Sequence, residues 1–119
     1  MTESELFEQG LKHFDAAEYF EAHEVWEELW HTAQGAYHPF IQGLIQCSVA
    51  MHHATNQNWN GTRKLLAGSL SYLKKGLSAS HTVDVDALQD AILDFEIALQ
   101  KKLQGEMIEL PFFKMPLKK

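Results

Sequence analysis

The sequence predicts an all-α protein, an antiparallel bundle of about five helices followed by an extended C-terminal tail. Apolar residues recur every three or four positions along most of the 119-residue chain, which is the spacing of one face of an α-helix. The alternating pattern of a half-buried strand is absent, and no internal repeat is evident. Short connections predict that successive helices are antiparallel neighbours. The length suits one domain, which we place at residues 1–104, with the tail at 105–119.

The first two helices are expected to begin at capping boxes. Thr2 is followed three residues later by Glu5, a pair that satisfies free N–H groups at a helix start. Asp15 and Glu18 have the same spacing, so we expect a second helix over residues 16–33. The apolar face of the first helix consists of Leu6, Phe7, Leu11 and Phe14.

The third helix is expected to be the buried centre of the bundle. Between Leu29 and Thr62 the chain contains no Asp, Glu, Lys or Arg, which is typical of a buried element. Pro39 suits the first turn of this helix, which runs to about Thr55. An Asn-rich turn that ends at Gly61 then leads into the fourth helix.

Two further apolar faces predict the fourth and fifth helices. Residues 78–82 form the loop between them, and Asp84 caps the fifth helix. Pro111 and Pro116 keep the tail extended, because proline lacks the N–H that a helix needs. The tail must therefore lie on the surface or along a neighbouring helix. The two faces are Leu65, Leu66, Leu70, Leu73 and Leu77, and Leu88, Ile92, Phe95, Leu99 and Leu103.

Composition excludes several classes of function. The formal net charge of −6 argues against nucleic acid as a partner. No apolar run approaches the ~20 residues that a membrane span needs, and no secretory signal is visible. The single cysteine, Cys47, excludes an intramolecular disulfide and fits a reducing compartment, so we expect a cytoplasmic protein. Cys47 also lies on an apolar stripe, which favours a buried residue over a nucleophile.

The second helix holds the one break in the amphipathic pattern. On a helical wheel, His23 and Glu27 fall inside the arc of aromatic residues. An ionisable pair on a core face is costly unless the two groups interact, and a spacing of four makes them neighbours. Breaks of this kind concentrate at functional sites. We therefore predict a site on His23 and Glu27.

The third helix offers matching polar residues. Gln42, Gln46 and His53 fall on one stripe. Counting outward from the turn between the two helices brings Gln46 level with His23 and Gln42 level with Glu27. His53 lies about one and a half turns further on. A cluster of these side chains is the candidate site.

The same segments carry a resemblance to a known family. The motif H-x-x-x-E-x-x-W at residues 23–30 is followed by Q-G-L-I-Q at residues 42–46, then by His52, His53 and the Asn-rich turn. Together these resemble the bacterial and archaeal family called domain of unknown function 309. The resemblance implies an all-helical domain whose motif is suggested to bind metal. It implies no established reaction.

One hypothesis for the function is a small metal-binding protein. His23 and Glu27 are the expected ligands, with His53 as the third. Zinc or manganese suits such nitrogen and oxygen ligands, and a bound water would permit hydrolysis. In a catalytic site Glu27 would be the base or a ligand, and His23 a ligand or the acid.

Two other hypotheses need no metal. In the first, a groove between the second and third helices binds a small molecule or a peptide through Gln42, Gln46, Trp26 and Trp30. In the second, the chain is a structural or oligomerisation module, in which a buried hydrogen bond between His23 and Glu27 sets helix register. A second apolar surface on the fifth helix, together with the tail, would allow a homodimer or would dock the tail itself.

Overall fold

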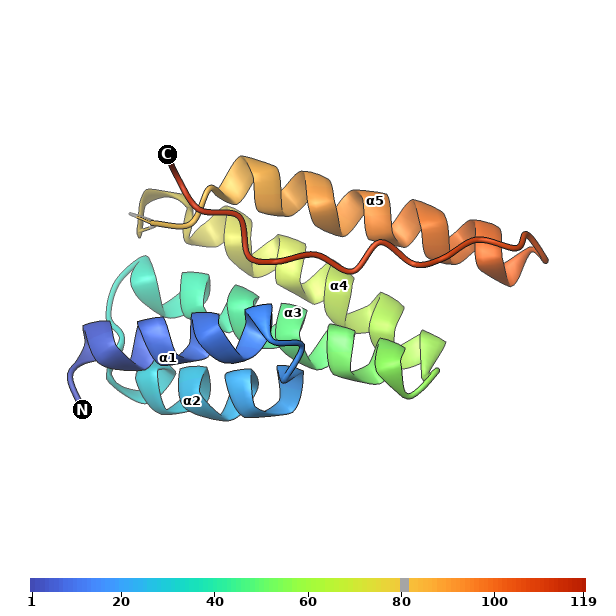
Figure 1. The fold of residues 1–119 in the computed structure, drawn as a ribbon. Helices are drawn as coiled ribbons and strands as arrows, with labels where there is room; N and C mark the ends of the chain where they lie inside the picture. Colours follow the sequence, from blue (N-terminus) through green and yellow to red (C-terminus); the bar gives the residue numbers. More distant parts are fainter. Residues whose placement is uncertain (80–81) are drawn as a thin grey trace.

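The computed structural model describes residues 1–79 and 82–119 (Figure 1). Within these ranges the chain forms five α-helices and one 3₁₀ turn, which confirms the all-α bundle. None of the described helices is long and apolar enough to cross a membrane. The predicted loop over residues 78–82 lies partly outside the described residues. The elements are α1 (Glu3–Asp15), α2 (Tyr19–Thr32), α3 (Tyr37–Thr55), α4 (Trp59–Lys75), the 3₁₀ turn Leu77–Ala79 and α5 (Val85–Leu103).

The first four helices form two antiparallel hairpins that turn in the same way. The N–H of Glu18 donates to the carbonyl of His13 at 2.8 Å, and the N–H of Asn58 donates to that of His53 at 2.9 Å. In each turn the residue before the donor has a positive φ, which is 62° at Ala17 and 59° at Gln57. The sequence does not reveal this similarity, because the two turns carry different side chains at most of their equivalent positions.

The first capping box is confirmed and the second is wrong. The Thr2 hydroxyl accepts from the N–H of Glu5, and the Glu5 carboxylate accepts from that of Thr2. Asp15 is instead the last residue of α1, and Glu18 precedes α2 without capping it. The physical reason is the sharp turn at Ala17, which ends α1 before α2 begins.

Helix α3 is the buried centre of the bundle, as its lack of charge predicts. It packs against α2 on one side and α4 on the other. A Cβ at Gly43 would lie 2.8 Å from Cγ of Leu73, so this glycine lets α4 approach closely. The Ser69 hydroxyl donates to the Gly43 carbonyl at 2.7 Å. The buried residues of α3 are Phe40, Ile41, Gly43, Leu44, Ile45, Cys47, Ser48, Ala50, Met51 and Ala54.

The tail runs back along α5 and ties it to the first hairpin (Figure 1). The N–H of Asp84 donates to the carbonyl of Pro116 at 3.0 Å. On the other side, the N–H of Met115 donates to the Asp15 carboxylate at 2.8 Å. The ring centroid of Phe112 lies 5.2 Å from that of Phe95 in α5. Asp15 therefore holds the tail and caps no helix.

The apolar faces of α4 and α5 are buried except near their ends. Leu77 lies beyond the last residue of α4, Leu103 is the last residue of α5, and both are exposed. Leu93 and Ile97 lie on the outer side of α5 and are 46% and 56% exposed. The tail does not cover them, so the homodimer stays a prediction.

The thiol of Cys47 is expected to be unreactive in the folded protein. Cys47 is completely buried, and burial raises the pKa of its thiol to about 12. Because the thiolate is the reactive form, an aromatic disulfide reagent at pH about 8 should modify almost none of it. The same reagent in guanidinium chloride should modify one thiol per chain. Rapid reaction of the folded protein would contradict this burial.

Candidate functional site

A groove of about 490 Å³ lies between α2, α3 and α4. Helix α3 contributes most of its lining, through the polar stripe that the sequence singles out. Helices α2 and α4 form its sides. The lining residues are His23, Glu27, Trp30, His38, Pro39, Gln42, Ile45, Gln46, Val49, Leu65 and Tyr72.

The His23 ring is held by the backbone of its own helix. Its Nδ1 lies 2.9 Å from the carbonyl oxygen of Phe20, and because a carbonyl only accepts, Nδ1 carries the proton. Its Nε2 lies 3.2 Å from Oε2 of Glu27. When the ring is protonated, Nε2 forms an ion pair with Glu27. When it is neutral, Nε2 presents a lone pair beside the carboxylate.

This pair lines the groove and is partly exposed, so the expectation that the pair is buried is wrong, while its role in setting helix register stays a prediction. The side chain of His23 is 20% exposed and that of Glu27 is 53% exposed. The core face of α2 is narrower than the wheel predicts, because Phe20 is itself 46% exposed. On the wheel Phe20 lies on the far side of Glu27 from the other aromatic residues of α2, so an arc that excludes Phe20 also excludes Glu27. The core residues of α2 are Tyr19, Ala22, Trp26 and Leu29.

The two tryptophans of α2 have different roles. Trp26 is fully buried, its ring occupies the space that a side chain at position 10 would need, and its Nε1 donates to the Phe7 carbonyl at 3.3 Å. The prediction that Trp26 contacts a ligand is therefore wrong. Trp30 does line the groove. Its ring stacks on that of His38, with centroids 4.4 Å apart and planes at 27°.

Gln42 and Gln46 lie in the groove with His23 and Glu27, as the counting of turns predicts. Oε1 of Gln46 lies against α4, in the space that a Cβ at Gly68 would fill. This glycine therefore gives the Gln46 amide its position beside α4.

His53 does not complete a metal site with the other two predicted ligands. Its Nδ1 accepts from Nδ2 of Asn58 at 3.1 Å, at the turn into α4, and it does not line the groove. Throughout residues 1–79 and 82–119, no three His, Cys, Asp or Glu side chains gather in a way that would hold a metal ion. His23 and Glu27 could thus provide two metal-coordinating atoms.

Two polar residues that line the groove, His38 and Tyr72, were not predicted from the sequence. His38 lies four residues before Gln42 on the same face of α3, so extending the stripe back by one turn finds it. Tyr72 lies seven residues after Leu65 on α4, with Gly68 between them. A small residue between two larger ones on one helix face is a weak signal of a groove, because it is also common in tight helix packing.

The chain matches a known family over a segment that holds every lining residue of the groove except Tyr72. Residues 7–65 match the model of the family described as Domain of unknown function (DUF309). The chain is also 33% identical, over 70 residues, to the uncharacterized protein YpuF of Bacillus subtilis (strain 168). That match covers 58% of this chain and 40% of the relative, so the chain spans about two fifths of the relative's length. Through residues 7–65, which include the H-x-x-x-E-x-x-W motif and both glutamines, this chain belongs to the DUF309 family.

Proposed function

We propose that this protein is a binding module whose groove takes a small molecule with both apolar and hydrogen-bonding groups. The observation that supports this is the meeting of a stacked aromatic pair, two amides and a His–Glu pair in one groove. Its volume of about 490 Å³ lies within the range of about 300–1,000 Å³ that is usual for small-molecule pockets. A few polar groups set in an apolar lining fix the orientation of a ligand.

Each part of the groove has a distinct task in this proposal. The amides of Gln42 and Gln46 both donate and accept hydrogen bonds, so they recognise a group such as an amide, a urea or a heterocycle. Glu27 accepts a further hydrogen bond from the solvent-exposed side. Ile45 and Leu65 contact the apolar part of the ligand.

A divalent metal is the second candidate ligand, favoured by the geometry of His23. Metal-binding histidines commonly donate their other ring N–H to a backbone carbonyl, as Nδ1 of His23 does to Phe20. Nε2 of His23 and Oε2 of Glu27 are then the two donors. Structural and catalytic zinc sites use at least three protein ligands. Two protein donors do not complete such a site, so a bound ion would need further donors from a small molecule bound in the groove.

The glutamines provide the sharpest test of the groove. We expect a subset of compounds in a fragment library to shift the side-chain amide resonances of Gln42 and Gln46 in nuclear magnetic resonance spectra. Gln42→Ala should lower the affinity for those fragments about tenfold, because it removes a hydrogen bond. The matched control is Gln34→Ala, since Gln34 is exposed and lies outside the groove. Equal binding to both variants would contradict the proposal.

Metal content separates the two candidate ligands. Untagged protein and its His23→Ala variant would be purified without chelators, exposed to zinc or manganese, and analysed by mass spectrometry for metal per chain. Near-stoichiometric metal that disappears in the variant would favour the metal. Equal metal content in the two proteins, together with fragment binding that depends on Gln42, would favour the small molecule.

A further inference from the structure

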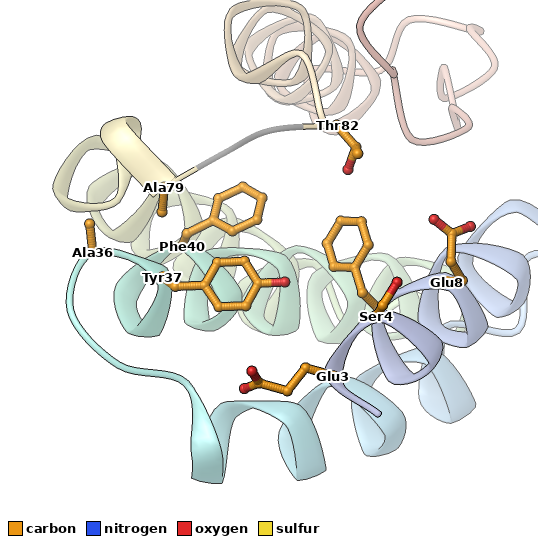
Figure 2. A pocket seen from close by; sticks show the side chains of 9 residues that line it. Glu3, Ser4, Glu8, Ala36, Tyr37, Phe40, Ala79 and Thr82 are labelled. Atoms are coloured by element: carbon orange, nitrogen blue, oxygen red, sulfur yellow. The ribbon is translucent and has the colours of Figure 1, made fainter. Parts of the chain in front are cut away.

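A second pocket lies between the start of α1 and the start of α3 (Figure 2). Its volume is about 540 Å³ and it shares no lining residue with the groove. Three aromatic rings form its walls. The ring centroid of Phe40 lies 5.9 Å from that of Tyr37 and 6.5 Å from that of Phe7. The remaining lining residues are Glu3, Ser4, Glu8, Ala36, Ala79 and Thr82.

The charged groups of this pocket are both acidic. Glu3 and Glu8 extend from α1 on different sides of the ring cluster (Figure 2). Among the described lining residues there is no Lys, Arg or His. The Thr32 hydroxyl donates to Oε2 of Glu3 at 3.0 Å, which leaves Oε1 for another donor. The charges that the described lining residues bring to the pocket are therefore all negative.

Tyr37 adds a neutral polar group to the pocket. Its hydroxyl is directed toward α1 in Figure 2. Burial, and then the charge of Glu3, raise the pKa of Tyr37, so the hydroxyl stays neutral over the physiological range. The described lining of the pocket thus combines three aromatic side chains with two carboxylates.

From this arrangement we propose that the pocket binds a small organic ammonium ion with an apolar body. The negative charges of Glu3 and Glu8 attract the ammonium group from two sides of the ring cluster, and the aromatic rings attract the same charge. The apolar body lies in the pocket against Phe7, Tyr37 and Phe40. Helix capping explains one of the acids, since Glu3 lies at the start of α1 where negative charge is favourable. It does not explain Glu8, which lies beyond the first turn, nor the aromatic cavity.

The proposal is tested with phenethylammonium chloride as the probe and neutral 2-phenylethanol as its isostere. We expect the cation to bind with a dissociation constant of about 1 mM, measured by shifts of the Tyr37 and Phe40 resonances. The alcohol should bind at least about tenfold more weakly, because it keeps the ring and loses the charge. Binding of the cation should also weaken as salt is added.

Two double variants show whether the two carboxylates cause the preference for the cation over the alcohol. The double variant Glu3→Gln, Glu8→Gln should bind the cation about tenfold more weakly and bind the alcohol with unchanged affinity. Glu21→Gln with Glu24→Gln makes the same change of net charge at exposed positions of α2 outside the pocket, and should leave binding unchanged. Circular dichroism would verify that both variants fold. Equal affinity for cation and alcohol, equal weakening in both variants, or no binding at about 10 mM would overturn the proposal.

Discussion

Replacement of Trp26 by alanine is expected to lower the free energy of unfolding by about 3–5 kcal/mol. Trp26 is completely buried, and its ring centroid lies 6.2 Å from that of Phe14 and 6.5 Å from that of Phe7. The variant loses these contacts, leaves a cavity and leaves the Phe7 carbonyl without its indole donor. Because a small domain has only about 5–15 kcal/mol in total, the variant should be close to unfolding at 37 °C.

Denaturation in urea, followed by circular dichroism, measures this loss. Trp30→Ala is the matched control, because Trp30 lines the groove and is only partly buried. We expect the control to lose less than half as much free energy. Equal losses in the two variants would show that the assignment of Trp26 to the core and Trp30 to the groove is wrong.

A companion substitution checks the same contact from the other side. An alanine Cβ at position 10 would overlap the indole of Trp26, so Gly10→Ala should destabilise the protein by about 1–3 kcal/mol. In the Trp26→Ala background the same change should be neutral or stabilising, because the space is empty and alanine is the better helix former. A double-mutant cycle should therefore show that the effect of Gly10→Ala on the free energy of unfolding changes sign when Trp26 is replaced.

Removal of the tail, residues 105–119, is expected to have the other large effect. The tail supplies Met115 to the core, and its backbone pairs with the segment before α5. Phe112 and Phe113 cover rings of α5 and of the first hairpin. Loss of a buried methionine side chain alone typically costs about 2–5 kcal/mol. We therefore expect the truncated chain to melt well below the full chain.

Hydrogen exchange shows where the truncated chain loosens. Amides of α5 should lose protection first, because α5 has few contacts with α4 and the tail provides its link to the first hairpin. Amides of α3 should keep most of theirs. Asp15→Ala is a milder variant that removes only the acceptor of the Met115 N–H, and it should show the same order of loss. Uniform loss of protection would contradict the role of the tail as a local tie.

The sequence predicts the helices well because each helix carries its own evidence. The capping box at Thr2 and the cap at Asp84 are local hydrogen bonds, and both are present. The charge-free segment predicts the buried position of α3 because a central helix has almost no surface for charged side chains. Counting turns from a short connection places Gln42 and Gln46 beside His23 and Glu27 because antiparallel helices have nearly the same rise per residue.

Only the tertiary structure decided which side of each helix another element covers. Helical periodicity predicts which face of a helix is apolar. The neighbouring elements decide how much of that face is buried. This is why Phe20 and Glu27 are exposed while Trp26 is buried. The path of the tail and the use of Asp15 to hold it depend on a contact between distant parts of the chain. His53 is instead held by Asn58, five residues further on, at the turn into α4. The sequence by itself thus determined the helices and the composition of the groove. The packing between them decided which of the predicted residues lie in the groove and where a second pocket forms, because burial depends on the neighbours that the folded chain brings together.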